Sequence, residues 1–321
     1  MYKNIVNILF AATSDYIPYA LTTALSVKEN LNENYDLHIT YLYADIIKPI
    51  SDEERDNYIE YSKYCYKENN ININYINVEQ YMHLFEGQNV GLWDKPVSMT
   101  HYMYLLAPMI LTDINKIIYL DTDTIVNTDL SAIYNIDLDN YLLAMGAPRG
   151  QEEMGNNVCN SGFVFLNLEK WRSENVLHNL LDFGRKLPKA RFCDQYLLHQ
   201  YFTLNHSDRL LLLDSKLNIF PQLFLEIPLE DIKIFHYTGW KNIPPRKDID
   251  AKARGGFLWW KYARKTPFYE SFIMKNLYES KKEKESPKNN IFTIENSQDN
   301  RHKIITILGI KIKIRRKYTK S

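Results

Sequence analysis

KIIYLDTDTIV, residues 116–126, is an apolar run of strand length that ends abruptly in two carboxylates, Asp121 and Asp123. A buried strand that stops at Asp-x-Asp brings both acids to the carboxyl edge of a sheet, where open α/β proteins bind their ligands. Two oxygen donors there suit a hard divalent cation that keeps some of its waters and takes a diphosphate as a further ligand. On this pattern alone, a metal site and a chance pairing of acids are equally good interpretations.

The same spacing of acids occurs twice more, at Asp137 and Asp139 and at Asp248 and Asp250. Neither pair follows a comparable apolar run. We therefore interpret both pairs as loop or helix-capping residues and place the candidate metal site at residues 121–123.

Strand and helix patterns alternate over the first 126 residues. One helix begins with the capping box Ser51-Asp52-Glu53-Glu54. The expected strands are 5–12, 37–43, 71–78 and 116–120, and the expected helices are 19–30, 51–68 and 98–111. This alternation predicts an α/β fold with a largely parallel sheet covered on both faces. The sequence contains neither Gly-x-Gly-x-x-Gly nor Walker A, so nucleotide phosphates are not held in either of those two ways.

The composition indicates a folded protein of the cytosol. The 321 residues are 45% hydrophobic and include 24 Tyr and 14 Phe, which suffices for a sizeable core. Three cysteines without metal-type spacing indicate reduced thiols and therefore a cytosolic location. No segment approaches 18 consecutive apolar residues, so we expect no membrane span. Residues 5–12 are interpreted as a first strand rather than a signal peptide.

Charge is distributed unevenly along the chain. The 39 basic and 39 acidic residues balance, but residues 301–321 hold eight Lys and Arg and no acid. Residues 1–300 therefore hold 31 basic and 39 acidic residues, a net charge of −8. Residues 280–300 are polar, and we interpret them as a linker between a domain at 1–279 and a basic tail at 301–321.

The tail alternates Ile with cations over residues 310–315, which argues against an amphipathic helix. Two interpretations stay open for it. It forms a hairpin against the acidic body, or it contacts the anionic inner face of a membrane. Nucleic acid is a weaker partner, because the body is acidic and the chain carries no RNA-binding motif.

Four stretches, taken in order, resemble the family 8 glycosyltransferases, which include bacterial lipopolysaccharide galactosyltransferases and glucosyltransferases and glycogenin. They are FAATSDY (10–16), YLDTD (119–123), CNSGFVFLNL (159–168) and HYTG (236–239). Asp194-Gln195 and WWKYARKTPFY (259–269) extend the resemblance, which covers residues 5–275. It implies a GT-A fold, the Rossmann-like fold of nucleotide-diphospho-sugar transferases, with a mainly parallel central sheet. It also implies transfer of a hexose from a UDP-sugar with retention at the anomeric carbon.

The resemblance further implies a set of metal ligands. Asp121, Asp123 and His236 would coordinate Mn²⁺, with Mg²⁺ as the alternative, and the ion would bridge the diphosphate of UDP-hexose. Thr122 is counted with the donor-binding residues. His236 follows the stretch IKIF (232–235), which predicts a strand end. Without the family pattern, a histidine there is more often a satisfied structural side chain.

The end of the first strand carries the nucleotide in this family. By position, Ala11 and Thr13 would face uridine. Asp15 would form a hydrogen bond with it, and Tyr16 would stack on uracil. The alternative is that Thr13, Ser14 and Asp15 cap the following helix, and both roles can coexist at a helix N-terminus.

The resemblance places Asn160, Asp194 and Gln195 against the donor sugar. Asp194 and Gln195 are the catalytic candidates, because they would hold sugar hydroxyls close to the reacting carbon. A turn at Asn160 and a helix cap at Asp194 are the alternatives. Retention can proceed through a carboxylate nucleophile or through departure of UDP and attack on the same face, and both routes stay open.

Two departures from the family pattern stand out. The family's Thr-x-Tyr-x-Arg reads THYMY and ends at Tyr104, where a cation is expected. The family's Gly-x-x-Lys-Pro-Trp reads GWKNIPP from Gly239. Lys241, the expected diphosphate contact, therefore stands one residue early. Either this loop takes a different path, or the basic residues 246–247 supply the charge.

We therefore predict a cytosolic enzyme, peripheral on the inner face of the cytoplasmic membrane. It would transfer galactose or glucose from UDP-hexose to an oligosaccharide or lipid-linked glycan such as lipopolysaccharide. A sugar-nucleotide pyrophosphorylase is the alternative enzyme, but it needs a Gly-rich basic loop after the first strand, and AATSD (11–15) has neither Gly nor a cation. A membrane-docked scaffold that binds the sugar nucleotide without turnover is the alternative outside enzymes.

Overall fold

The computed structural model describes residues 4–275 except 47, 68–70, 89, 92–98, 150–157, 189, 192, 221–222, 224–225 and 239–255, and it also describes residues 292–296, 302–307 and 310–315. The chain divides into two compact units, Met1–Glu270 and Ser271–Ser321. Each unit is described by itself.

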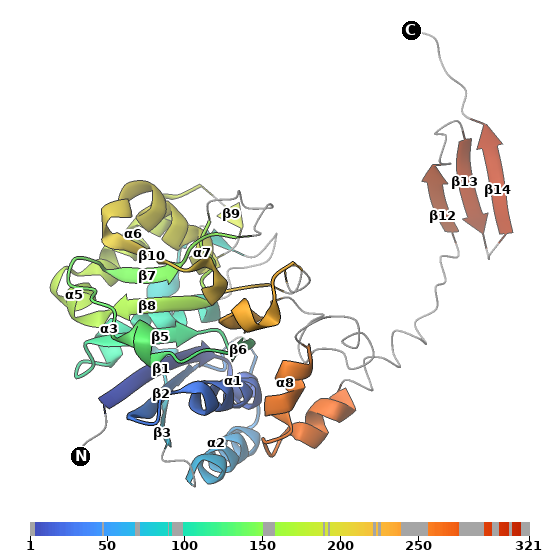
Figure 1. Ribbon diagram of the computed structural model, residues 1–321. Helices are drawn as coiled ribbons and strands as arrows, with labels where there is room; N and C mark the ends of the chain where they lie inside the picture. The colour runs from blue at the N-terminus through green and yellow to red at the C-terminus, as the bar shows by residue number, and fades with distance from the viewer. Residues whose placement is uncertain are drawn as a thin grey trace. The chain divides into compact units, whose positions relative to one another are not determined.

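A seven-stranded sheet in the order β10-β7-β8-β5-β1-β2-β3 forms the centre of the first unit (Figure 1). Its strands are β1 (Asn4–Ala12), β2 (Tyr35–Tyr43), β3 (Ile71–Asn77), β5 (Lys116–Leu120), β7 (Leu143–Gly146), β8 (Phe163–Asn167) and β10 (Leu210–Leu213). Within it, β8 runs antiparallel to both its neighbours, and the other pairs are parallel. The predicted α/β fold with a mainly parallel sheet is confirmed.

Two short ribbons accompany the sheet. In the first, β6 (Thr124–Val126) pairs antiparallel with β11 (Ile234–His236). In the second, β4 (Val90–Gly91) pairs parallel with β9 (Ala190–Arg191).

Helices cover both faces of the sheet. They are α1 (Ile17–Asn30), α2 (Asp52–Lys67), α3 (Ala107–Ile110), α4 (Ser131–Tyr134), α5 (Leu168–Ser173), α6 (Val176–Lys186), α7 (Cys193–Leu198) and α8 (Gly256–Ala263). Short 3₁₀ or π segments are η1 (Ser14–Tyr16), η2 (Glu79–Phe85), η3 (Met99–Leu106), η5 (His199–Thr203), η6 (Ser207–Arg209), η7 (Ser215–Leu217) and η9 (Leu229–Asp231).

The alternation of side chains along the strands gives the sheet two apolar faces. On one face, Leu9, Tyr119 and Val164 belong to a core that residues of η3, α5, α6 and α7 complete. On the other face, Phe10 and Tyr41 surround a small apolar cavity together with residues of α1. Both faces are therefore buried, as the sequence predicts for strands with continuous apolar runs.

Most predicted elements of the first 126 residues lie within two residues of the observed bounds. The capping box is present in part, because the Glu54 backbone N–H donates to the Ser51 hydroxyl at 3.1 Å. The helix predicted at 98–111 differs, because the chain winds as the 3₁₀ segment η3 before the short helix α3. Pro108, at the start of α3, lacks the N–H that would continue an α-helical ladder from η3.

The second unit contains a three-stranded antiparallel sheet of β12 (Phe292–Asn296), β13 (His302–Ile307) and β14 (Ile310–Arg315). Strand β14 coincides with the segment in which Ile alternates with cations. Strand β12 lies inside the predicted linker 280–300. Residues 292–296 therefore belong to this sheet, since their backbone pairs with β13.

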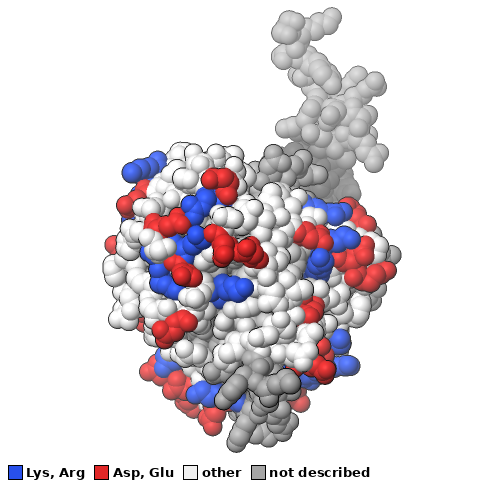
Figure 2. Space-filling model, turned by 60° about the vertical axis from the view of Figure 1, so that its left-hand side comes forward, with Lys and Arg blue, Asp and Glu red and all other residues white. Residues whose placement is uncertain are grey.

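Acidic and basic side chains are interspersed on the face of the described residues shown in Figure 2. Such mixing is typical of a solvated surface. Among the described residues, no helix combines the length and apolar character that a bilayer crossing requires.

Candidate active site

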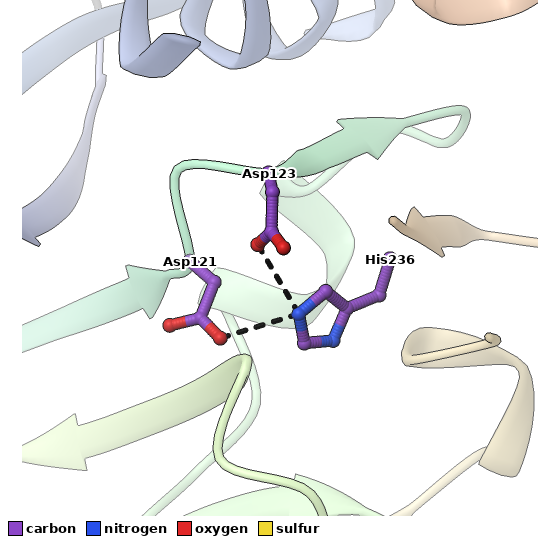
Figure 3. A group of neighbouring side chains, drawn as sticks. All are labelled: Asp121, Asp123 and His236. Carbon is purple, nitrogen blue, oxygen red and sulfur yellow. Dashed lines mark ion pairs between the residues drawn. The ribbon is translucent and has the colours of Figure 1, made fainter. Parts of the chain in front are cut away.

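Asp121, Asp123 and His236 form one group at the carboxyl end of β5. Their ligand atoms all lie within 4.8 Å of one another. The His236 Nε2 atom is 3.2 Å from Asp121 Oδ2 and 3.2 Å from Asp123 Oδ1, and Figure 3 shows both carboxylates directed at this nitrogen. The ribbon of β6 and β11 creates this proximity, because it places His236 opposite Thr124, the residue after Asp123.

A hydrogen bond with Asn218 fixes the orientation of the His236 ring. Its Nδ1 atom lies 2.8 Å from Asn218 Oδ1, so Nδ1–H donates to this oxygen and Nε2 faces the carboxylates. His236 is 2% exposed. Burial lowers the pKa of His236, but Asp123 and Asp121 raise it more, to about 10. The two carboxylates therefore stabilise a positive charge between them, which the protonated imidazole supplies when no cation is bound.

This donor set fits a divalent cation. Two carboxylate oxygens and one imidazole nitrogen are suitable ligands for such an ion, and the hydrogen bond from His236 to Asn218 is the outer contact that metal-binding histidines usually make. Burial raises the pKa of Asp121, but the His236 contact and a hydrogen bond from Tyr119 lower it below its usual range. Asp121 is therefore ionised at neutral pH.

Gly162 makes room for this arrangement. A Cβ atom at position 162 would lie 2.3 Å from His236 Cε1. The Gly162 backbone also accepts a hydrogen bond from the Asp121 N–H at 3.0 Å. The contact with His236 therefore explains why this position carries no side chain.

The predicted nucleotide residues lie at the end of β1. Ala11 is buried, and Tyr16 is 37% exposed, so part of its ring is open to a stacking partner. The Thr13 hydroxyl donates to Asp15 Oδ1 at 2.5 Å, and Asp15 forms an ion pair with Lys48. Thr13, the N-cap of η1, makes no side-chain cap hydrogen bond, so the structure gives no support to a capping role for it.

The predicted sugar-side residues come together from two elements. Asn160, ahead of β8, donates from Nδ2 to Gln195 Oε1 at 2.6 Å. Its Oδ1 accepts from the Gly162 backbone N–H at 2.8 Å, which is the expected turn, and from Asn218 Nδ2 at 2.7 Å. The turn and the contact with Gln195 therefore coexist at Asn160.

Asp194 lies in the first turn of α7 and is 5% exposed. Its Oδ2 accepts a hydrogen bond from the Tyr104 hydroxyl at 2.9 Å. Burial raises the pKa of Asp194 to about 6, although His101 and hydrogen bonds from Ser161 and Tyr104 oppose the rise. The pKa of this buried carboxyl group therefore lies close to neutral pH.

Asn218 connects the candidate metal ligands with the predicted sugar contacts, because its side chain forms hydrogen bonds with both His236 and Asn160. Sequence reasoning missed Asn218, Tyr119 and Lys48. Thr122 is buried between the two acids, and its carbonyl accepts from Thr23 at 3.0 Å. The predicted diphosphate contacts at positions 239 and 241 lie outside the described residues.

Residues 7–243 match the family model described as glycosyl transferase family 8. The chain belongs to glycosyltransferase family 8. Among its relatives in this family are the Streptococcus pneumoniae serotype 4 glycosyltransferases GlyE and GlyB. GlyE is 28% identical over 212 residues, which are 61% of this chain and 48% of GlyE. GlyB is 25% identical over 202 residues, which are 58% of this chain and 47% of GlyB. The chain therefore spans about half the length of these curated relatives.

Solved structures agree on the fold of this family 8 member. The galactosyltransferase LgtC, solved with donor and acceptor sugar analogues, superposes with a TM-score of 0.58 at 20% identity and covers 82% of this chain and 96% of LgtC. The bifunctional glycosyltransferase WbbM gives a TM-score of 0.64 at 13% identity over 86% of this chain and 52% of WbbM. The fold is thus of the GT-A type.

Proposed function

We propose that this family 8 member is a retaining, Mn²⁺-dependent hexosyltransferase that uses UDP-hexose. The observation that carries the proposal is the group of Asp121, Asp123 and His236 beside the pair Asp194 and Gln195. A divalent cation in this group would act as a Lewis acid and stabilise the charge that develops on the departing UDP.

The chain's own residues have separate tasks in this proposal. Asp121, Asp123 and His236 Nε2 would hold the cation, and the hydrogen bond to Asn218 would keep the imidazole oriented toward it. Asn160 and Gln195 present an interlocked pair of amides to the donor sugar. Asp194 accepts a hydroxyl hydrogen of that sugar, and Tyr16 stacks on the uracil ring.

We further propose that the acceptor is an oligosaccharide or a lipid-linked glycan such as lipopolysaccharide. The basic tail at 301–321 supports contact with an anionic membrane surface on the cytoplasmic side, because each Lys or Arg near such a surface contributes about 1 kcal/mol. Eight such residues on this segment give a favourable electrostatic attraction.

Replacement of a single carboxylate tests the metal assignment. In Asp123→Ala, release of UDP from UDP-hexose in the presence of Mn²⁺ should fall by about 100-fold or more, because one of three ligands is lost. The melting temperature without metal should fall, because the ion pair between Asp123 and His236 is lost, and it shows whether the variant is still folded at the assay temperature. Asp139→Ala is the matched control, because Asp139 is exposed and belongs to an Asp-x-Asp pair outside the group. Full turnover in Asp123→Ala would show that this carboxylate holds no catalytic metal.

A further inference from the structure

Tyr104 and Tyr119 form a stacked pair beneath the site. Their ring centroids are 4.0 Å apart with an interplanar angle of 12°. Tyr104 is fully buried and Tyr119 is 5% exposed. The pair comes from two elements, because Tyr104 belongs to η3 and Tyr119 to β5.

The two hydroxyls of this pair serve two different carboxylates. Tyr119 donates to Asp121 Oδ1, on the metal side. Tyr104 donates to Asp194 Oδ2 at 2.9 Å, on the sugar side. Because a close-packed interior transmits displacements, a shift of either ring should alter the separation of the two carboxylates.

A second path of contacts joins the same two sides. The side chain of Asn218 forms hydrogen bonds with both His236 and Asn160. The side chain of Asn160 in turn donates to Gln195, the neighbour of Asp194 in the sequence. The stacked tyrosines and these hydrogen-bonded amides therefore connect the two sides of the site by two separate routes. A hydroxyl in such a hydrogen-bonded network influences the positions of the groups that it contacts.

Asp194 needs donors at this position because it is buried. His101 of η3 and the hydrogen bonds from Ser161 and Tyr104 lower its pKa, while burial and the Asp121 carboxylate raise it. The Tyr104 hydroxyl is thus a neutral donor at the position where the family pattern has a cation. A phenylalanine would fill the same core space without serving this carboxylate.

We propose that Tyr104 is a positioning residue, whose hydroxyl orients Asp194 toward the donor sugar and whose ring sets the separation of Asp194 from Asp121. This inference rests on the proposed function, in which Asp194 accepts a sugar hydroxyl. It predicts an effect on turnover that exceeds the effect on nucleotide binding, since the Tyr104 hydroxyl donates to Asp194 and its ring stacks on Tyr119.

Tyr104→Phe is the decisive variant, because it keeps the ring and removes the hydroxyl. With full-length protein, Mn²⁺ and UDP-hexose, kcat should fall by about 10- to 100-fold, as when an outer hydrogen-bond partner is lost. The dissociation constant of UDP should stay unchanged. The acid limb of the kcat/KM profile should move to higher pH, because Asp194 loses a donor that favours its ionised form.

Tyr134→Phe is the matched control. Tyr134 is also buried, and its hydroxyl donates to the Lys116 carbonyl at 2.9 Å, away from the site. It should keep the wild-type kcat and pH profile. A wild-type kcat in Tyr104→Phe, or equal losses in both variants, overturns the positioning role. A wild-type protein that neither binds nor turns over UDP-hexose overturns the proposed function as well, and this result is distinct from the first two.

Discussion

Substitution of Gly162 by alanine should disturb the group of Asp121, Asp123 and His236 without replacing any of these three residues. The new methyl carbon would lie 2.3 Å from Cε1 and 2.5 Å from Nδ1 of His236, and 2.9 Å from Oδ1 of Asn160. Ordinary van der Waals contact begins at 3.4 Å, so the imidazole would have to retreat by about 1.1 Å. The backbone of residue 162 is itself held by the Asp121 N–H, so the displacement falls on the side chains.

A shift of this size exceeds what a metal site tolerates, since ligand distances must hold to within about 0.2 Å. We expect the affinity for Mn²⁺ in the presence of UDP to fall by about 10- to 100-fold in Gly162→Ala. Overpacking should also lower the free energy of unfolding by about 1–3 kcal/mol. Titration calorimetry with Mn²⁺ measures the first quantity, and denaturant unfolding without metal measures the second.

Gly146→Ala provides the control. A Cβ atom at position 146 would meet Leu217 Cβ at 3.5 Å and the Asp214 carbonyl oxygen at 3.6 Å, which are ordinary contacts. This variant should bind Mn²⁺ as the wild type does. If Gly162→Ala also binds Mn²⁺ with wild-type affinity and releases UDP at the wild-type rate, then metal binding does not depend on the position of the His236 imidazole beside residue 162.

Three further predictions concern other parts of the chain. Tyr16→Ala should weaken UDP binding by about 1–3 kcal/mol in calorimetry, and unchanged binding would refute base stacking. Asp194→Asn should stabilise the metal-free protein at pH 7 by about 3 kcal/mol, because a folded-state pKa of about 6 lies above the unfolded value of 3.8 and the native carboxyl destabilises the fold as pH rises through that window. The gain should shrink to about 0.5 kcal/mol near pH 4 in thermal melts, and an equal gain at both pH values would contradict the sign. Deletion of residues 301–321 should abolish salt-sensitive cosedimentation with anionic liposomes and spare turnover of a water-soluble acceptor, whereas loss of that turnover would mean that the tail belongs to the fold.

The parts of the site that were visible in the sequence are those marked by local patterns. Asp121 follows an apolar run that folds as β5, and His236 is the last residue of β11. A strand end is visible because side-chain periodicity is a property of neighbouring residues. The link between these two ends came from the family resemblance, because pairing of β6 with β11 joins residues about 110 positions apart.

The parts that were missed depend on distant partners. Asn218 acts through Asn160, 58 positions earlier, and through His236, 18 positions later, and no local pattern announces either contact. The alternative of a turn at Asn160 is present in the structure, but no local pattern shows that His236 fills the space beside Gly162. At Tyr104, the pattern showed which cation was absent, but only the fold shows that the new hydroxyl reaches Asp194.

The ribbon of β6 and β11 has a consequence for the order in which the protein matures. All seven strands of the central sheet are complete once residue 213 has been synthesised, yet the third proposed metal ligand is residue 236. Closing the long loop from β6 to β11 carries an entropic penalty that local strands and helices avoid. A nascent or truncated chain that ends between these points would hold the complete sheet and lack the imidazole ligand. In the proposed site, tight metal binding would then be acquired only after the central sheet is complete.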